Sequence, residues 1–468
     1  MVWAVLAVAG LNRFCLAGGL HVGVAVVDIT PPVGFRTGGG YGEVVSTAVD
    51  DPLFAKAIVL RQTETTVALV ICDLLSVPPD LTRQAQQLCH KECGITPQNV
   101  IIAATHNHGS PEYWGSLRDL AHNAAIAEHG HDPHEPVDYQ SQLVQACAQS
   151  VTDAVDNLQP SVIQFAVGRQ DGLAFNRRFH MKDGSVRFNP GMGNPDILRP
   201  AGPVDPDLPV ILFQAVDSDS TAIASLTTFA MHTAVHGGTT FSADFPAVMQ
   251  RVLQKKFGAG FVSVFAEGTA GDINHIDVSN SRPLRGRAEV ERIGHTLAGS
   301  VHKTLANAKE LNNTDLAIVS QTGFARFQPV SEARFRESML QLQHQKTMRL
   351  PFLTTVAAWR DCHRWRYTEM YPDGLKPLLV QGIRLNQDTA IVTLPHEVFV
   401  ELGMAIRATS PFRNTIVISL AGDVDFYIPT RRAFEEGSYE VTTCPLDAGC
   451  GEILFDTARS VLKQLKSE

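Results

Sequence analysis

The sequence predicts an α/β fold, with mixed β-sheets flanked by helices, and two observations lead to this prediction. Short apolar runs of strand length alternate along the chain with longer amphipathic stretches of helix length. Side chains that bind ligands recur where the apolar runs end, which is the edge at which open α/β sheets hold their ligands. With 468 residues, 44% of them hydrophobic, the chain is long enough to bury a large core.

The order of the expected elements follows from the length and periodicity of these runs. The expected strands are 21–29, 54–60, 66–73, 99–105, 161–168, 208–216, 222–232, 260–268, 388–395 and 415–422. The expected helices are 80–93, 137–157, 244–257, 285–309, 398–408 and 453–467. We expect Asp80 and Asp244 to be helix N-caps. No internal repeat or linker divides the chain, so residues 21–468 are expected to form a single domain.

The segment 328–376 interrupts the alternation of strands and helices. It is helical, basic and aromatic, as in ARFRESMLQLQHQKTMRL and WRDCHRWRY. We expect it to be a helical insertion that covers or extends the main body.

The ends of the chain and its net charge limit the classes of partner. Residues 1–20 are apolar but too short to span a membrane. They carry no positive charge before the apolar run, so we expect a degenerate signal or an upstream extension. The net charge of −9, without a basic patch, argues against nucleic acid as the main partner. No transmembrane segment is expected. Peripheral membrane contact, the oligomeric state and the compartment (secreted, periplasmic or cytoplasmic) stay open.

The eight cysteines are scattered and form no CxxC motif, which argues against a thiolate zinc site or a redox motif. Cys89 and Cys93 lie four residues apart in an expected helix, and we expect them to be packing residues. Cys444 and Cys450 flank a short loop, and pair across it only if the compartment is oxidising.

Two histidines follow the apolar run NVIIAA in the stretch ATHNHGSPEYW, residues 104–114. Imidazole is a common metal ligand and acid/base group, so His106 and His108 are either the start of a site or two surface histidines in a turn. The following Gly-Ser-Pro is ordinary turn sequence, and the pair alone slightly favours the second interpretation.

Other apolar runs end in the same manner, which favours the first interpretation. The groups concerned are His232, His236, Glu267, Asp272, Glu397, Asp423, Asp425 and Tyr427. Imidazoles and a carboxylate brought to one sheet edge are the arrangement that a metal hydrolase needs. The recurrence therefore predicts a metal site at the carboxyl ends of the strands.

Seven segments in order resemble the catalytic domain of the neutral/alkaline (non-lysosomal) ceramidase family. They are GVAVVDITPPVG, DDPLFAKAIVL, ATHNHGSP, FAMHTAVHGG, FAEGTAGDINH, LPHEVFVELG and DFYIPTRRAFEEGSYE, between residue 22 and about residue 440. The resemblance implies one zinc ion (Zn2+) per chain and a ceramidase-like catalytic domain over residues 21–468. The ligands that it implies are His106, His232, Glu397 and Tyr427.

The resemblance also implies roles for side chains beside the metal. His108 would hydrogen-bond the reacting group or a ligand, Tyr439 matches a second site tyrosine, and Arg177 in FNRRF matches a site arginine. Candidate donors to a developing oxyanion are Tyr439, Arg177 and Asn274. The general base would be Asp272, Glu267 or His108.

Two departures from the family pattern bear on the substrate. Asn274 stands where the family's ceramidases carry an essential serine, and an amide side chain is neither a base nor an oxygen nucleophile. No C-terminal β-sandwich domain is expected after the tyrosine element. Both departures argue against ceramide itself and leave the metal ligands in place.

The function expected from these residues is zinc-dependent hydrolysis of an amide C–N bond by metal-activated water. The substrate class is a small-molecule, N-acyl or lipid-like amide, which the resemblance connects with sphingolipid metabolism. The alternatives are a zinc esterase or lactonase, and a catalytically silent homologue that binds metal or lipid, for which Asn274 argues.

A histidine-rich stretch, LAHNAAIAEHGHDPHEP, is expected to be a long loop between a strand and a helix. Its histidines are expected to face solvent, and a second divalent ion there is the less favoured alternative. They are His122, His129, His131 and His134.

Overall fold

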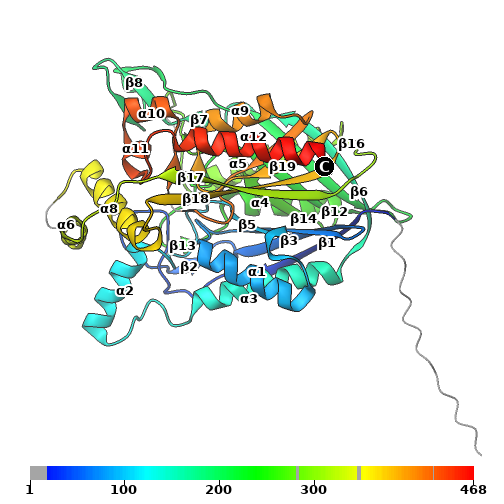
Figure 1. Cartoon of the computed structure of the whole chain (residues 1–468), viewed down its shortest axis with the longest axis horizontal. Helices are drawn as coiled ribbons and strands as arrows, with labels where there is room; N and C mark the ends of the chain where they lie inside the picture. The colour runs from blue at the N-terminus through cyan, green and yellow to red at the C-terminus, as the bar shows by residue number, and fades with distance from the viewer. Residues whose placement is uncertain (1–17, 281–283, 345–348, 425) are drawn as a thin grey trace, which may run out of the picture.

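The computed structural model describes residues 18–280, 284–344, 349–424 and 426–468 (Figure 1). Most of the expected N-terminal extension and Asp425 lie outside the described residues. Within those residues, the structure contains no helix with the length and apolar character needed to cross a membrane.

Most of the described strands belong to two sheets, and both are mixed. The larger has nine described strands, in the order β14-β12-β11-β6-β1-β3-β4-β5 with β16 beside β6. Its bounds are β1 His21–Asp28, β3 Phe54–Gln62, β4 Thr65–Cys72, β5 Val100–Ala104, β6 Gln159–Arg169, β11 Asp207–Ala215, β12 Ala222–Phe229, β14 Val262–Glu267 and β16 Lys309–Glu310. Parallel pairing in this sheet joins β4 to β5 and β12 to β14.

The smaller sheet has four described strands in the order β17-β18-β19-β21, and its last pair is parallel. Its bounds are β17 Ala317–Arg326, β18 Leu375–Asn386, β19 Thr389–Thr393 and β21 Asn414–Ile418. Short pairs complete the strands: β2 Ala48–Val49 with β13 Thr240–Phe241, β7 Phe175–Asn176 with β15 Ile273–Asn274, and β20 Glu397–Val398 with β22 Tyr427–Ile428. β8 Arg178–Met181, β9 Val186–Phe188 and β10 Ile197–Pro200 form a small three-stranded sheet.

The two large sheets face each other, with helices on both outer faces (Figure 1). Alternate residues of each strand point to opposite faces, so Ile58 and Ile71 of the larger sheet meet Ile383 and Ile416 of the smaller one. The other face of the larger sheet packs under α1 Pro79–Cys93, α3 Tyr139–Asp156, α4 Asp244–Phe257 and α5 Arg287–Leu305. The outer face of the smaller sheet packs under α9 Val400–Thr409 and α12 Cys450–Ser467.

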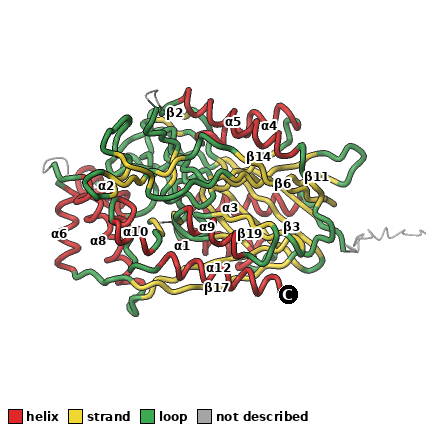
Figure 2. Tube along the Cα trace, turned by 90° about the horizontal axis from the view of Figure 1, so that it is seen from above, coloured by secondary structure: helices red, strands yellow, loops and turns green. Residues whose placement is uncertain are grey.

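The insertion expected at 328–376 is helical. It contains α6 Glu332–Gln343 and α8 Phe352–Met370, which pack on one another beside the main body (Figure 2). The remaining described helices are α2 Ser116–His129, α10 Arg431–Glu436, α11 Tyr439–Thr443 and the 3-10 turn η1 Pro97–Asn99.

The predicted fold class and the ten predicted strands are confirmed, but both predicted N-caps are wrong. Helix α1 begins after Pro78, and Asp80 in its first turn pairs with Arg83. Helix α4 is capped by Ala243. Asp244 has a left-handed φ of 55°, and its buried carboxylate accepts hydrogen bonds from three backbone amides. These are the amides of Val235, His236 and Phe245.

The seven described cysteines are free thiols. Cys89 packs in the core under α1, as expected. Cys444 and Cys450 are buried beside one another, and the hydrogen bond with the Cys444 thiol, together with burial, raises the pKa of Cys450 well above its ordinary value.

Candidate metal centre

His106 and His108 leave the end of β5 on a sharp turn, in which His106 has a φ of 58°. The Nδ1 atom of His106 lies 3.0 Å from the carbonyl oxygen of Leu75, and that of His108 lies 3.0 Å from the carbonyl oxygen of Gly39. A carbonyl only accepts hydrogen bonds, so Nδ1 carries the proton in each ring. In the neutral rings, Nε2 therefore keeps its lone pair, as a metal ligand requires.

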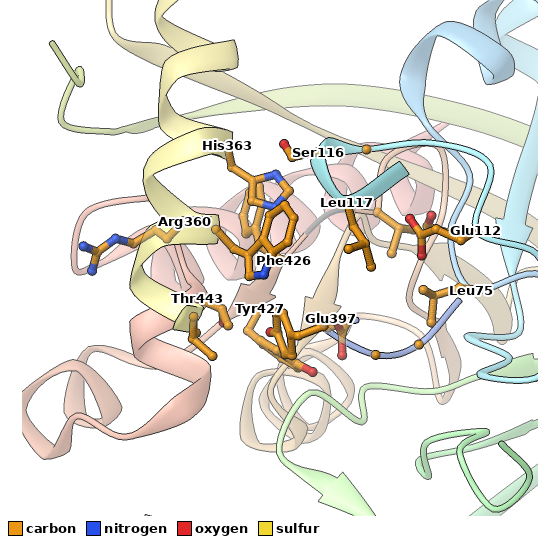
Figure 3. A pocket seen from close by; sticks show the side chains of 18 of the residues that line it. Leu75, Glu112, Ser116, Leu117, Arg360, His363, Glu397, Phe426, Tyr427 and Thr443 are labelled. Atoms are coloured by element: carbon orange, nitrogen blue, oxygen red, sulfur yellow. The ribbon is translucent and has the colours of Figure 1, made fainter. Parts of the chain in front are cut away.

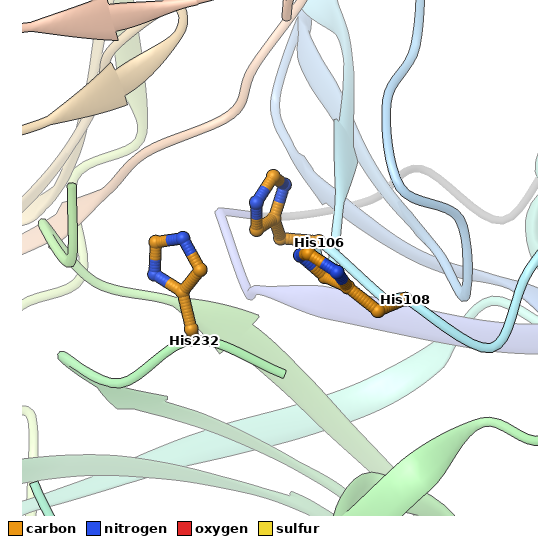
Figure 4. Close-up of side chains that lie close together, drawn as sticks. All are labelled: His106, His108 and His232. Atoms are coloured by element: carbon orange, nitrogen blue, oxygen red, sulfur yellow. The ribbon is translucent and has the colours of Figure 1, made fainter. Parts of the chain in front are cut away.

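The rings of His106, His108 and His232 come together in space (Figure 4), with one nitrogen of each within 4.8 Å of the others. His232 follows β12. Glu397 joins the group from β20, and its Oε2 lies 3.1 Å from Nε2 of His106 and 3.0 Å from Nε2 of His232. His106, His232 and Glu397 are buried, and His108 is half-buried. The sequence prediction that these groups converge is thereby matched by the structure.

The donor set fits a divalent cation, because two of its atoms are buried without a satisfactory partner. Among the described residues, no well-aligned hydrogen bond reaches Nε2 of His108 or Oε2 of Glu397. Leaving such groups unsatisfied costs stability. A cation at Oε2 of Glu397 would satisfy the carboxylate, and a group bound beside that cation would satisfy Nε2 of His108. Imidazole nitrogen with carboxylate oxygen is a donor set that suits zinc.

The charges of the cluster are strongly coupled. Burial alone would raise the pKa of the Glu397 carboxyl, but His106 and His232 hold it well below its ordinary value. Burial lowers the pKa of His106, yet Glu397 and Glu267 outweigh it and raise that pKa to about 9. Burial, with neighbouring Arg177, lowers the pKa of His232 to about 3. The protein alone therefore holds one proton on His106, in the place that a cation would take.

Tyr427 lies beside Glu397 because the short strands β20 and β22 pair in parallel with these two residues in register. The Tyr427 ring stacks on the His232 ring at a centroid distance of 6.4 Å and an angle of 12°. Tyr427 is thus next to the histidine cluster, as the resemblance implies, and its role as a ligand stays a prediction.

Arg177 lies across this cluster. Its NH1 is 3.0 Å from Nε2 of His232, and its guanidinium carbon is 5.0 Å from the Tyr427 ring centre and 5.8 Å from that of Tyr439. Its Nε donates to Glu440 over 2.8 Å. Glu440 is fully buried and also accepts from Arg178. Sequence reasoning missed Glu440, although it directly follows the tyrosine matched to the family.

Asp272, one of the three side chains expected to act as base, has both carboxylate oxygens engaged by other partners. One carboxylate oxygen accepts from the Val400 amide at the start of α9, and the other accepts from Asn176 over 2.7 Å. Burial raises its pKa to about 6. These contacts favour a role in joining β7 to α9 over a role as base.

Glu267, at the end of β14, is nearer to the histidines. Its Oε1 lies 3.8 Å from Nδ1 of His232, and burial raises its pKa to about 8. This separation is too long for a hydrogen bond, so Glu267 is a buried neighbour of the cluster and not a bonded partner of His232. His236 and Asp423 have other partners, since His236 bonds Thr240 and Asp423 pairs with Lys376.

Two cavities meet at the cluster and share Tyr41, His108, Tyr427 and Tyr439 in their walls. The first is largely apolar and lies under α8, which contributes Arg360 and His363 to one side (Figure 3). Its apolar lining includes Trp114, Leu117, Val356, Trp359 and Phe426.

The second cavity has a volume of about 590 Å³. Asn274 lines it, donates to Asn189 over 3.2 Å, and accepts from the Ile276 amide. Asn274 therefore faces the same space as Arg177, His108 and Tyr439. The glycine-rich stretch 38–42, which sequence reasoning did not single out, lines the cavity opposite; a run of glycines is itself a signal of close backbone approach.

The histidine-rich stretch is not the long loop that the sequence predicts, because residues 116–129 form helix α2. The first half of the stretch, AHNAAIAEH, contains several alanines, and the high helix propensity of alanine favours a helix over a loop. His129 and His131 are exposed as expected.

His122, Asp132 and Glu135 lie close enough together to hold an ion. However, Asp132 already accepts from Arg36 over 2.7 Å, and Glu135 accepts from Arg118 over 2.8 Å. The two guanidinium groups neutralise these carboxylates, so the cluster is an ion-pair network that opposes a second cation.

The layered α/β fold and the buried His–Glu cluster fit a metal-dependent hydrolase. Residues 20–276, more than half of the chain, match the family model described as neutral/alkaline non-lysosomal ceramidase, N-terminal. The chain belongs to this family, and it is accordingly a hydrolase of the type that acts on amide bonds.

Solved structures share its fold. The crystal structure of neutral ceramidase from Pseudomonas aeruginosa aligns with a TM-score of 0.69 and 17% sequence identity, over 96% of this chain and 75% of that chain. A structure described as ceramidase complexed with C2 aligns with a TM-score of 0.68 and 18% identity, over 97% of this chain and 76% of that one. No curated protein sequence matches the chain significantly.

Proposed function

We propose that the protein is a zinc-dependent hydrolase that cleaves the C–N bond of an N-acyl or lipid-like amide. One observation carries this proposal: the Nε2 atoms of His106 and His232 converge on the same oxygen of Glu397, at 3.1 and 3.0 Å. His106, His232 and Glu397 would hold one zinc ion, with Tyr427 beside Glu397 as the fourth ligand. When bound, zinc supplies a Lewis acid that activates water for attack on a carbonyl carbon.

The residues around the ligands would bind the substrate and stabilise charge. Arg177 is a fixed cation, held by Glu440 and directed at the cluster, and can stabilise negative charge that develops on the carbonyl oxygen. His108 keeps an unprotonated Nε2, because burial and the neighbouring His106 and His232 lower its pKa well below the ordinary value. It can therefore accept a proton from a reacting group. Tyr439 can donate one.

The side chains that line the two cavities favour an amide substrate with one apolar part and one part that forms hydrogen bonds. The apolar cavity under α8 offers Trp114, Trp359 and Phe426 to a hydrocarbon or ring. The second cavity offers Asn189 and Asn274 to groups that form hydrogen bonds. Asn274, in place of the expected serine, favours an N-acyl amide other than ceramide.

The test compares purified wild type with the variant His106→Ala/His232→Ala. We expect about one zinc per wild-type chain by mass spectrometry, loss of that zinc in the variant, and loss of hydrolysis of a panel of N-acyl amides in the variant and after chelation. His295→Ala is the matched control, because His295 is an exposed histidine on α5 and bonds only within that region.

The outcomes separate the alternatives. A wild type that holds no zinc and cannot be loaded with it would exclude the zinc proposal. Bound zinc with faster turnover of esters than of amides would assign a zinc esterase, and bound zinc without any turnover would assign a silent homologue.

A further inference from the structure

We propose that Tyr41 is a positioning residue that directs the hydroxyl proton of Tyr439 into the reaction site; this inference rests on the proposed amide hydrolysis. Tyr41 lies in the stretch TGGGYG, between β1 and β2. Its phenol oxygen is 2.8 Å from that of Tyr439, a hydrogen-bonding distance. Both residues line both cavities, so the pair lies where the two cavities meet.

The backbone around Tyr41 is tied to the histidine cluster. The Gly38 amide donates to the carbonyl of Ser110 over 2.7 Å, and the Gly39 carbonyl accepts from Nδ1 of His108 over 3.0 Å. Gly39 has a φ of 87°, and a Cβ at that position would lie 2.5 Å from Nδ1 of His108. The loop that carries Tyr41 is thus packed against His108 with no room between them.

The ring of Tyr41 is fixed from two further sides. It meets the ring of Tyr439 edge-on, with centroids 6.3 Å apart at 89°, and the ring of Phe352 at 5.8 Å and 78°. Phe352 begins helix α8, and Tyr439 begins helix α11. Three segments that are distant in sequence therefore hold this phenol in one place.

The hydroxyl pair has two possible directions, and only one leaves Tyr439 able to act on substrate. A phenol has one proton to donate and lone pairs to accept with. If Tyr41 donates to Tyr439, the proton of Tyr439 stays available for a substrate oxygen, and the accepted bond makes Tyr439 a better donor. Burial and the neighbouring Tyr439 raise the pKa of Tyr41 well above its ordinary value, so Tyr41 keeps the proton that it donates.

The test is a double-mutant cycle of Tyr41→Phe and Tyr439→Phe, measured on the amide that the wild type cleaves. Tyr41→Phe retains the ring and removes only the hydroxyl. We expect kcat to fall about tenfold with KM changed less than about twofold, because a transition-state interaction is lost. In the Tyr439→Phe background, Tyr41→Phe should have no further effect on kcat.

The matched control is Tyr139→Phe, which removes a buried hydroxyl that donates to the Ile29 carbonyl in the core. This control should leave kcat unchanged. Full additivity of the two site variants, or an unchanged kcat in Tyr41→Phe, would overturn the proposal.

A second readout does not depend on catalysis. The chain has seven tyrosines, so 3-fluorotyrosine labelling gives a ¹⁹F spectrum in which the Tyr439 signal is assigned by its loss in Tyr439→Phe. We expect Tyr41→Phe, but not Tyr139→Phe, to shift that signal. An unshifted signal overturns the hydroxyl pairing. If the signal shifts but the wild type cleaves no amide, then the proposed hydrolysis fails while the pairing stands.

Discussion

Arg177 and Glu440 form a buried ion pair, with 2.8 Å between Nε and Oε1, although 263 residues separate them in the sequence. The same carboxylate accepts from Arg178, so one buried anion holds two buried cations. Arg177 in turn reaches His232 and lies over Tyr427. Glu440 therefore fixes a cation beside the candidate ligands.

Removing the charge of Glu440 should damage both stability and activity. Glu440→Gln leaves Arg177 and Arg178 buried with reduced compensation, and breaking such a pair costs about 3–5 kcal/mol. We expect that loss in the free energy of unfolding by urea denaturation, with at least about a tenfold fall in kcat/KM as Arg177 loses its orientation. Glu436→Gln is the control, because Glu436 pairs with Arg178 at a more accessible position. Equal losses in both variants would contradict a special role for Glu440.

The glycine-rich loop offers a matched pair of substitutions. Gly39→Ala would place a Cβ 2.5 Å from Nδ1 of His108 on a backbone with a φ of 87°, whereas a Cβ at Gly40 meets nothing within 4 Å. We expect Gly39→Ala to lower kcat/KM at least about tenfold through displacement of His108, and Gly40→Ala to change it less than about twofold. Steady-state kinetics of the two variants check this, and similar values for both would show that His108 tolerates movement of the loop.

Asn274 should determine part of the substrate preference. Asn274→Ser shortens the side chain, removes the bond to Asn189, and introduces the hydroxyl that the family resemblance predicts at this position. We expect kcat/KM for ceramide to rise relative to a short N-acyl amide, and we expect no such rise in Asn274→Ala, which opens the same space without a hydroxyl. Identical preferences in the two variants would assign the effect to volume alone.

Acid should weaken the network around Asp132. Burial raises the pKa of this carboxyl, but the hydrogen bond from Arg36 outweighs it and lowers the pKa from 3.8 to about 2. Because the folded pKa is the lower one, the stabilisation is present above pH 3.8 and is lost as the pH falls toward 2, by at most about 2 kcal/mol. Denaturation between pH 2 and pH 7 measures it. Asp132→Asn should lower the free energy of unfolding at neutral pH and make it depend less on pH between pH 2 and pH 4. An unchanged pH dependence in this variant would assign the acid sensitivity to other side chains.

The sequence predicted those parts of the fold that depend on local periodicity. Strands β3, β4 and β5 are recovered because each is a largely continuous apolar run with most of its residues buried, and β6 is recovered from its alternation of buried and more exposed residues. Strands β17 and β18 were missed, since Gly323 and Pro377 interrupt their patterns and the helical insertion separates them. The N-caps failed because both residues lie inside the first turn of their helices: Asp80 pairs with Arg83, and Asp244 follows the N-cap position held by Ala243.

The candidate site divides in the same way. The structure brings together His106, His232 and Glu397, which the sequence singled out because each follows an apolar run and the resemblance set them in order. Glu440 and Tyr41 were not found, because their partners are hundreds of residues away and only the folded chain brings them together. Helix α2 replaced a predicted loop because its alanine-rich centre outweighs its histidines.

The candidate ligands come from two different sheets, and this origin has a consequence for assembly. His106 and His232 extend from strands of the larger sheet, whereas Glu397 and Tyr427 follow strands of the smaller one. Residues 20–276, which match the family model, include both histidines but neither the glutamate nor the tyrosine. Neither half of the polypeptide contains the whole donor set. The candidate centre therefore assembles only when the two sheets pack together, and a bound metal ion would in turn stabilise that packing.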